Sequence, residues 1–386
     1  MTKTEKALHG QRPRIGIDLH VVDGIFQGSR THCLELFSRV IACTLECDFV
    51  VLANDPQKLL SFSESFALPH VTILPMPKLP APARILWQLP QIVRRHGISL
   101  LHTQYIAPPV PFCATAVTVH DILFESHREY FEKSFVFRSR LLVPFSIRHS
   151  ALVFTVSEFS RRQICDTYSI PAEKVHTIPN GVDVARFFPG DAGRDAIRDL
   201  GLKSGGYFLT VGRLEPRKNH ATLLRAWAQL TTPRPLLVIV GQRHFWYGET
   251  FDLIRTLHLE QEVLVLEQIS DEQLPAIYRN AKGFVYCSWA EGFGMPVLEA
   301  MASGIPVVSS HNTALSEVCA DAALGVDASN SSEISNAILQ LDEQSGLREN
   351  LIHRGLLKAK EFNWERPAQT VRSVYLRHFG LVPHGT

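Results

Sequence analysis

The sequence predicts an α/β protein built from two doubly wound, Rossmann-like domains. Three observations support this fold class. The chain has 386 residues, more than one ordinary hydrophobic core accommodates. Short apolar runs alternate with amphipathic stretches, the pattern of parallel strands covered by helices on both faces. The alternation stops once, near residues 179–193, and then starts again.

The first half of the chain contains seven short apolar runs, which we interpret as strands. They are bounded by polar or turn-forming residues, as expected for strands buried on both faces. These runs occupy residues 14–20, 48–53, 71–75, 99–105, 114–121, 151–157 and 174–179. Amphipathic stretches at 29–43, 86–96 and 135–149 predict helices between them. The first predicted domain spans residues 1–185.

The stretch PNGVDVARFFPGDAG, residues 179–193, predicts a linker because it is rich in Pro, Gly and Asp and has no periodicity. After it, the predicted strands are 207–214, 236–241, 263–268, 283–288 and 305–310. The predicted helices are 220–230, 271–281, 296–303, 331–343 and 347–361. A second domain, 195–363, is therefore expected, with one more amphipathic helix at 365–379 inside a terminal segment, 364–386.

Two such domains are expected to face a central cleft. Ligands of doubly wound sheets bind beyond the carboxyl ends of the strands, and pockets often form where two domains meet. Residues that follow strands are therefore the first candidates for a site.

Composition and charge exclude several classes of function. Lys and Arg total 39 against 38 Asp and Glu, a formal net charge of +1, so we expect no nucleic-acid partner. No apolar run is long enough to span a membrane, and the first residues lack the apolar segment of a signal peptide. Seven scattered cysteines without a Cys-x-x-Cys motif are typical of reduced thiols. We therefore expect a cytoplasmic protein.

The stretch EGFGMPVLEAMASGIPVVSS, residues 291–310, places two glutamates around a glycine turn that opens a helix. Pro296 suits the first helical position, and the unpaired N–H groups of a helix start bind phosphate-like groups. Carboxylates cannot hold phosphates, but they accept hydrogen bonds from sugar hydroxyls. A glutamate that only complements the helix dipole is the alternative. That alternative explains Glu299 but neither Glu291 nor the glycines.

The stretch TVGRLEPRKNH, residues 210–220, places Arg213 and Lys218 where a strand ends and a helix begins. Two cations at such a point suit a diphosphate without a metal ion. The alternative is that Lys218 is a solvated surface side chain. The chain has neither a His-Glu-x-x-His nor an Asp-x-Asp motif, so we expect no metal site.

Two positions in the first half are further candidates. His120 ends the predicted strand 114–121, which favours a place in the cleft, although a structural buried histidine is the alternative. The loop GIFQGSRTH, residues 24–32, opens a predicted helix and contains Gly28. It does not fit the Gly-x-Gly-x-x-Gly fingerprint of dinucleotide-binding proteins.

Together these motifs resemble the retaining glycosyltransferases of family 4, also called group 1, which have the GT-B fold. The resemblance rests on Arg213, Lys218 and the Glu-x7-Glu pair Glu291/Glu299. The segments VTVHDILFE, FTVSEFSRR, KVHTIPNGVD, VGRLEPRKNH and EGFGMPVLEAMASGIPVV follow the order of that family. The first half is most similar to the bacterial mannosyltransferase-like branch that builds surface polysaccharides. The resemblance also implies that the segment 364–386 crosses back to the N-terminal domain.

The resemblance implies a nucleotide-diphosphate sugar as the donor, bound by the C-terminal domain, with the N-terminal domain on the acceptor side. Arg213 and Lys218 would neutralise the diphosphate, and Glu299 would accept hydrogen bonds from the ribose. Glu291 would hold the sugar hydroxyls, and His120 would reach the sugar from the other domain. The backbone of the loop Gly292, Phe293, Gly294 and Met295 would lie against sugar and phosphate.

Two departures from the family affect its less specific positions. Phe26 and Gln27 stand where the family often has a Gly-Ile-Gly-type turn, which leaves the role of Gly28 open. Gln268 stands where the family often has glycine, so contact of the base with the neighbouring Ile269 is also open.

We therefore expect a retaining, metal-independent hexosyltransferase without a cofactor, with mannose favoured as the sugar. The expected acceptor is a growing surface glycan or a lipid-linked molecule. A sugar-nucleotide epimerase, which needs no acceptor, and a phosphorylase, which needs phosphate, are alternatives on the same fold. A non-enzymatic nucleotide-sugar-binding protein is the third. A nicotinamide dehydrogenase lacks its glycine fingerprint.

A basic region of the first half suggests contact with a membrane surface. Between Arg84 and Arg162 there are ten Lys and Arg against five Asp and Glu. Such an excess could face anionic lipid at the inner membrane, where a peripheral protein would bind. A solvated charged face is the alternative.

Overall fold

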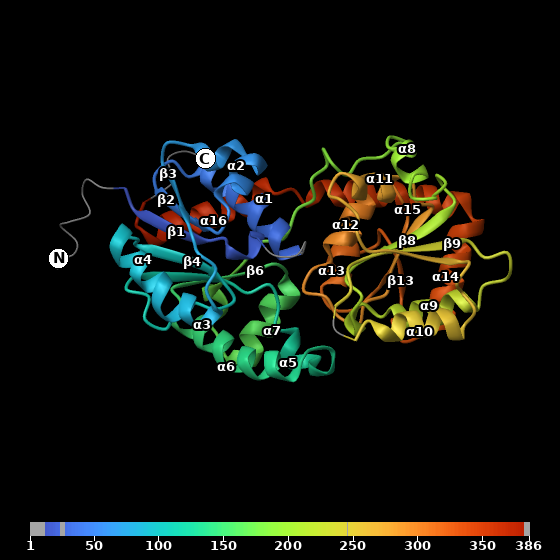
Figure 1. Cartoon of the computed structure of the whole chain (residues 1–386), viewed down its shortest axis with the longest axis horizontal. Coiled ribbons are helices and arrows are strands. Elements are labelled where there is room, and N and C mark those ends of the chain that lie inside the picture. Colours follow the sequence, from blue (N-terminus) through green and yellow to red (C-terminus); the bar gives the residue numbers. More distant parts are fainter. Residues whose placement is uncertain (1–11, 24–27, 245, 382–386) are drawn as a thin grey trace. The chain divides into compact units, whose positions relative to one another are not determined.

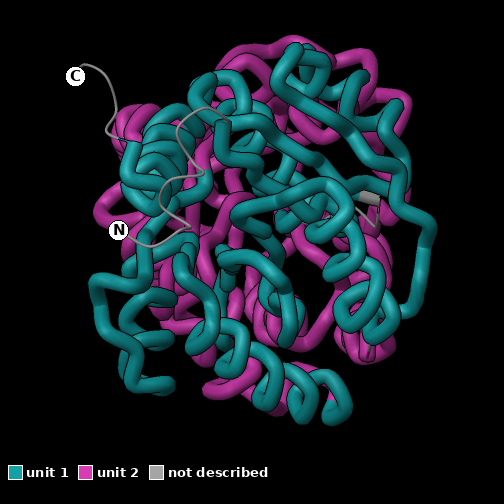
Figure 2. Tube along the Cα trace, turned by 90° about the vertical axis from the view of Figure 1, so that its left-hand side faces the viewer, with its two compact units in different colours: residues 1–122, 133–180, 364–386 teal, residues 123–132, 181–363 magenta. Residues whose placement is uncertain are grey.

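The computed structural model describes residues 12–23, 28–244 and 246–381, and the chain divides into two compact units (Figure 1). Unit 1 comprises the described residues within 1–122, 133–180 and 364–386, and unit 2 comprises those within 123–132 and 181–363 (Figure 2). The change from unit 1 to unit 2 comes after Asn180, near the start of the predicted linker 179–193 and before residue 185, the predicted end of the first domain. The reason is that the N–H of Val182 donates to the carbonyl of Phe362 at 2.9 Å, which ties the start of the linker to unit 2.

Unit 1 is built on a sheet of seven parallel strands in the order β3-β2-β1-β4-β5-β6-β7. All seven predicted strands are present, most of them shorter at their ends. They are β1 (Arg14–Asp18), β2 (Asp48–Ala53), β3 (Val71–Pro75), β4 (Leu100–Gln104), β5 (Ala114–Thr118), β6 (Leu152–Thr155) and β7 (Val175–Thr177). Every residue of β4 is buried, as expected for a central strand covered on both faces.

The helices of unit 1 include the three predicted between its strands and three that were not predicted, α2, α3 and α7. They are α1 (Gly28–Cys43), α2 (Pro56–Phe62), α3 (Ala81–Ala83), a π-helical segment (Arg84–Gln88), α4 (Leu89–His96), α6 (Lys133–His149), α7 (Glu158–Tyr168) and α16 (Glu365–His378). The unpredicted α2 and α7 both begin with a side-chain cap. Asp55 accepts from the N–H of Gln57, and Ser157 accepts from the N–H of Ser160.

The C-terminal helix α16 belongs to unit 1 and packs on α1. Arg39 of α1 pairs with Glu365 at 3.1 Å. Tyr375 is fully buried, and its hydroxyl is hydrogen-bonded to Nδ1 of His102 on β4. The end of the chain therefore completes the hydrophobic core at its beginning.

Unit 2 is built on six parallel strands in the order β10-β9-β8-β11-β12-β13. They are β8 (Tyr207–Val211), β9 (Leu236–Val240), β10 (Val263–Leu266), β11 (Gly283–Tyr286), β12 (Val307–Ser310) and β13 (Leu324–Val326). The first five were predicted. The sixth was missed because it has only three residues and only its last one is buried, so it gives no apolar run.

Helices cover both faces of this sheet (Figure 1). They are α8 (Arg194–Arg198), α9 (His220–Ala228), α10 (Gly248–Thr256), α11 (Gln273–Arg279), α12 (Met295–Ala302), α13 (Leu315–Cys319), α14 (Ser331–Glu343) and α15 (Ser345–Glu361). The short helix α5 (Leu123–Ser126) also belongs to unit 2. Short 3-10 turns lie at His20–Asp23, Glu64–Ala67, Arg128–Tyr130, Ala172–Lys174 and Pro216–Lys218. Among the described residues, no helix combines the length and the apolar character needed to cross a membrane.

Both sheets reverse their strand order once, between β1 and β4 in unit 1 and between β8 and β11 in unit 2. Such a switch point leaves a crevice at the carboxyl ends of the two strands, because the loops leaving them turn to opposite faces. In unit 2 these loops carry most of the candidate residues named above.

Candidate active site

The turn after β8 is held against the end of β11. Asn219, which precedes α9, has the left-handed backbone conformation with φ 58°. Its side-chain amide donates to the carbonyls of Cys287 at 2.9 Å and Ala328 at 2.7 Å. These buried hydrogen bonds fix the preceding residues, Arg217 and Lys218, at the switch point of the sheet.

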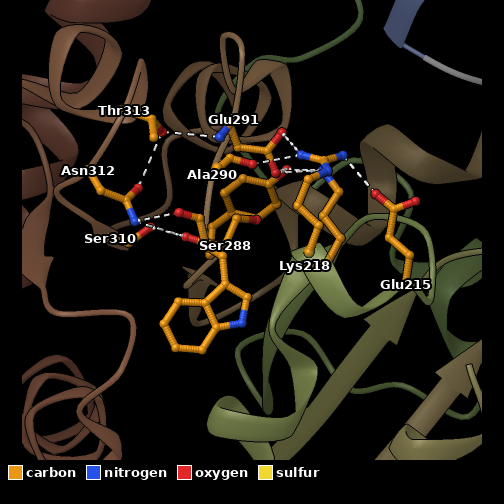
Figure 3. A network of polar contacts seen from close by, with 11 residues as sticks. Glu215, Lys218, Ser288, Ala290, Glu291, Ser310, Asn312 and Thr313 are labelled. Carbon is orange, nitrogen blue, oxygen red and sulfur yellow. Dashed lines mark hydrogen bonds and ion pairs between the residues drawn. The ribbon is translucent and has the colours of Figure 1, made fainter. Parts of the chain in front are cut away.

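Lys218 and Glu291 form the centre of a buried polar network in unit 2 (Figure 3). The Nζ of Lys218 donates to Oε1 of Glu291 and to the hydroxyl of Tyr286, both at 2.7 Å. Arg217 donates to Oε2 of the same carboxylate at 2.8 Å and to Oε1 of Glu215 at 2.7 Å. Both oxygens of Glu291 therefore contact cations, and only 7% of the residue is exposed.

The charges of this network set its ionisation states. Burial alone would raise the pKa of Glu291, but Arg217 and Lys218 lower it to about 2. Burial lowers the pKa of Lys218, and the attraction of Glu291 opposes that change. Burial also acts against the charge of Arg217, but Glu291 and Glu215 outweigh it and raise the pKa. We therefore take Glu291, Lys218 and Arg217 as charged at neutral pH.

The loop that carries Glu291 is fixed from the side of β12 (Figure 3). Ser310 donates to the carbonyl of Ser288 at 2.8 Å, and the amide of Asn312 donates to the carbonyl of Trp289 at 2.9 Å. The N–H of Glu291 donates to the hydroxyl of Thr313 at 3.1 Å. A loop tied down in this way holds its carboxylate in place before any ligand arrives.

Arg213 is the third cation near this network, and its side chain differs from those of Arg217 and Lys218 in its partners. No hydrogen bond or ion pair joins its side chain to any described residue, whereas Arg217 and Lys218 each have carboxylate partners. Burial lowers the pKa of Arg213; the attraction of Glu215 opposes this effect, and repulsion by Arg217 adds to it. Three cations thus face two carboxylates, Glu215 and Glu291. The cluster therefore has one more cation than it has carboxylates, and Arg213 is the cation that forms no ion pair with a described residue.

The glycine turn before α12 requires its glycine. Gly294 has φ 113°, and a Cβ atom there would lie 2.5 Å from Cδ2 of Leu315. The side chain of Phe293 is buried against Phe362, with 5.7 Å between the ring centroids, so only its backbone can face a ligand. The helix begins at Met295, one residue before the predicted Pro296, and no side chain caps it. An uncapped helix start leaves N–H groups for an anion.

Glu299 lies on α12, one turn into the helix, and is partly buried. Burial raises its pKa to about 7, an effect that the neighbouring Tyr278 hydroxyl opposes. Glu299 is thus half protonated near neutral pH, whereas Glu291 is fully ionised. The two glutamates of one motif therefore have different electrostatic states.

We expect binding of a nucleotide sugar to weaken as the pH falls through 7, if Glu299 accepts hydrogen bonds from the ribose as a carboxylate. Below pH 7 Glu299 of the free protein is mostly protonated, and binding must remove that proton. The affinity should therefore fall about tenfold as the pH is lowered from 8 to 6. Titration calorimetry measures this, with a nucleotide sugar whose diphosphate keeps its charge over that range. The Glu299→Gln variant should bind more weakly at pH 8 and without this dependence. A variant that keeps the wild-type slope would assign the titration to another group.

His120 follows β5 in unit 1 and is almost fully buried. Its Nε2 donates to Oε1 of Gln104 at 3.0 Å, and its ring lies edge-on to that of His32, with 4.6 Å between centroids. Burial, and the nearby His32 and His102, keep its pKa well below the usual value. His120 is therefore neutral at pH 7, and with its proton on Nε2 its Nδ1 can accept a hydrogen bond.

Two predicted positions remain, Gly28 and Ile269. Gly28 is the exposed first residue of α1, and the preceding residues 24–27 lie outside the described part of the chain. Ile269 is partly buried in the loop that follows β10. Of the candidates, Gly28 and His120 belong to unit 1 and the others to unit 2.

Sequence reasoning missed three members of the network: Glu215, Arg217 and Tyr286. Glu215 and Arg217 are within three residues of Lys218 in the same turn. Their closeness in the sequence could have indicated that they lie near Lys218 in the folded chain. Tyr286 ends β11, where parallel strands place residues beside a switch point. Within the described residues, no group of three or more His, Cys, Asp or Glu is arranged to hold a metal ion.

The two units together have the GT-B fold. Sucrose-phosphate synthase from Thermosynechococcus elongatus superposes with a TM-score of 0.76 at 20% identity, covering 96% of this chain and 100% of that one. Anabaena HepE, solved with UDP and glucose, also gives 0.76, at 19% identity over 95% of this chain and 100% of that one. These likenesses establish the fold.

The chain belongs to the group 1, or family 4, glycosyltransferases. Residues 195–357 match the family described as "Glycosyl transferases group 1", and residues 26–186 match "Glycosyltransferase Family 4". O-antigen chain mannosyltransferase B of Escherichia coli is 36% identical over 265 residues, 67% of this chain and 69% of that protein. O-antigen chain mannosyltransferase RfbU of Salmonella typhimurium is 28% identical over 250 residues, 64% of this chain and 63% of that protein.

Proposed function

We propose that this glycosyltransferase transfers mannose, with retention, from a nucleotide-diphosphate sugar to a growing surface glycan or lipid-linked acceptor. One observation carries the proposal: the switch point of unit 2 holds a surplus positive charge on Arg213, which has no hydrogen-bonding or ion-pair partner among the described residues. A diphosphate supplies the missing negative charge. Two similar proteins named as mannosyltransferases support mannose as the sugar.

In this proposal Arg213 and Lys218 bind the diphosphate. Arg213 is free to form a bidentate contact, and Lys218 has three donor positions, of which the network uses two. The leaving diphosphate gains negative charge as the glycosidic bond breaks, so fixed cations stabilise the transition state more than the ground state. The uncapped start of α12 adds N–H donors on the same side.

The two glutamates take separate roles. Glu299, one turn into α12, is proposed to accept from the ribose hydroxyls. Glu291 has both oxygens in contact with cations, so it holds Arg217 and Lys218 in position and, through its remaining lone pairs, accepts from the donor sugar. His120, neutral and fixed by Gln104, is proposed to hydrogen-bond the same sugar during transfer.

The anomer released from the donor tests the proposal without knowledge of the acceptor. Retaining transferases slowly hydrolyse their donors, and a mannose donor with an α linkage should first release α-mannose, observed by proton NMR before mutarotation. A panel of mannose, glucose and N-acetylglucosamine donors should stabilise the protein most with mannose. Release of the β anomer would contradict retention. Epimerised donor, or turnover that depends on phosphate, would instead indicate the alternatives on this fold.

Donor turnover should survive removal of divalent metal ions, because Arg213 and Lys218 supply the charge that a metal would otherwise provide. We expect rates with and without EDTA to agree within about twofold, since no step in the proposal depends on a Lewis acid. The control adds a divalent ion back after chelation. Loss of turnover with EDTA and its recovery with the ion would show that the two cations are not sufficient.

A further inference from the structure

Unit 1 exposes large apolar side chains on neighbouring elements, α3–α4, the loop before β5, and α6. We call this surface the basic aromatic face and define it by Leu86, Trp87, Phe112, Phe137 and Leu141 together with Arg94, Arg95, Lys133 and Arg138. Phe137 is 76% exposed, Leu141 65% and Trp87 58%. Exposed aromatic and aliphatic side chains gathered in one region mark interaction sites.

The exposed side of α6 is an apolar stripe. Phe137, Leu141 and Phe145 follow each other at intervals of four residues, so they lie on one side of the helix. The opposite side, with Val143 and Ile147, is buried in unit 1. The helix is therefore apolar on two sides, although only one of them has the protein core to pack against.

The elements of the basic aromatic face are connected by direct contacts. The guanidinium of Arg94 on α4 lies 5.0 Å from the ring centroid of Phe112, in the loop before β5. In the same loop, the N–H of Ala107 donates to the hydroxyl of Ser146 on α6 at 3.1 Å. In Figure 1, α3 and α6 both run along the lower edge of unit 1. These contacts join α4, the loop before β5 and α6 in one part of unit 1.

The charge of these elements has a single sign. The sequence has no Asp or Glu from Ser65 to His120, nor from Lys133 to Ser157, and each stretch contains four Lys or Arg. Arg94, Arg95, Lys133 and Arg138 are exposed. Cations beside exposed apolar side chains are the combination that enters the headgroup region of an anionic bilayer.

We propose that the basic aromatic face docks unit 1 onto an anionic lipid bilayer. The apolar residues project from helices and a loop, and Trp87 and the phenylalanines suit the boundary between headgroups and acyl chains. The Lys and Arg side chains reach lipid phosphates while their aliphatic parts cover apolar surface. This inference does not depend on the donor or on the sugar. It assigns unit 1, the expected acceptor side, to the membrane surface.

Flotation of the full-length protein with liposomes tests the proposal. Wild type should float with phosphatidylcholine vesicles that contain about a third phosphatidylglycerol. With pure phosphatidylcholine vesicles it should remain in the bottom fraction. Salt at about 0.5 M should release the bound protein, because screening shortens the range of charge interactions. The apolar variant Trp87→Ser/Phe137→Ser/Leu141→Ser should lose most of its binding. Each replacement among Arg94→Gln, Arg95→Gln and Arg138→Gln should weaken partitioning by about fivefold. The matched control, Leu357→Ser/Lys360→Gln on α15 of unit 2, should float as wild type does.

Tryptophan fluorescence gives a second measurement that does not depend on a destabilised variant. Anionic vesicles should shift wild-type emission to the blue, and brominated lipid should quench it. The Trp87→Phe variant should bind with little change in affinity but lose most of both signals, because none of the other four tryptophans belongs to the basic aromatic face: Trp364 is buried in unit 1, and Trp227, Trp246 and Trp289 belong to unit 2. Unchanged signals in Trp87→Phe would overturn the proposed orientation.

Three results would overturn the proposal. The apolar and the basic variants could float as well as wild type, or wild type could bind neutral and anionic vesicles equally at all salt concentrations. Light scattering could also show a dimer that the apolar variant breaks, with no lipid binding by either protein. In that case a second copy of this chain covers the face.

Discussion

Replacing Lys218 by Met should lower kcat/KM for donor turnover by about 10²–10³-fold, the effect of removing one fixed donor that stabilises developing negative charge. Methionine keeps the length and most of the volume of the side chain, while the charge, its hydrogen bonds and the contact of the ammonium with the ring of Tyr286 are lost. Most of the loss should appear in kcat, because the diphosphate gains charge in the transition state. Steady-state kinetics with the mannose donor measures both parameters.

The control for this variant is Lys282→Met, also in unit 2. Lys282 pairs with Asp342 at 2.6 Å, so the substitution removes a lysine and an ion pair of similar length at a more exposed position. We expect its kcat/KM to stay within about twofold of wild type, since exposed ion pairs contribute little. If Lys218→Met were also within a few-fold of wild type, Lys218 would be a structural residue that does not contact the donor.

Replacing Glu291 by Gln should destabilise unit 2 by about 3–5 kcal/mol, because removal of one partner leaves buried charges uncompensated. Glutamine has the same shape, but its amide N–H₂ faces the N–H groups of Arg217 or the ammonium of Lys218. Urea denaturation followed by tryptophan fluorescence measures the change, with Trp227 and Trp289 reporting on unit 2. Activity should fall as well, since Lys218 loses the group that positions it.

The pH dependence of this loss identifies its cause. The pKa of Glu291 is lowered from its ordinary 4.5 to about 2 in the folded protein, so its ionisation stabilises the fold above pH 4.5. That contribution, about 3 kcal/mol by proton linkage, disappears as the pH falls from 4.5 towards 2. The stability difference between wild type and Glu291→Gln should therefore shrink over this interval.

The control for Glu291 is Glu349→Gln, an exposed position on α15. We expect no more than about 0.5 kcal/mol of destabilisation there, as for most surface substitutions. A constant difference between Glu291→Gln and wild type down to pH 2 would show that packing, and not the charge of Glu291, causes the loss.

The strands, most helices and the family could be predicted from the sequence, because these depend on local and periodic signals. Apolar runs flanked by turn residues located twelve of the thirteen strands, and only the three-residue β13 gave no signal. The glycine turn before α12 was equally local, since Gly294 has a backbone conformation that other residues rarely adopt. The repeated β–α alternation was sufficient for the fold class.

The partners within the site were decided by the tertiary structure. The sequence placed Lys218 beside a diphosphate with Arg213, but the folded chain pairs it with Glu291, 73 residues away, and leaves Arg213 without a partner among the described residues. This pairing arises because the loops after β8 and β11 meet at the switch point, which depends on strand order and not on any local pattern. The change of unit after Asn180 has a similar cause, a hydrogen bond between Val182 and the distant Phe362. The sequence alone determined which residues are available for the chemistry. Only the packing of the sheets decided which charges compensate one another, because burial removes the water that would otherwise screen them.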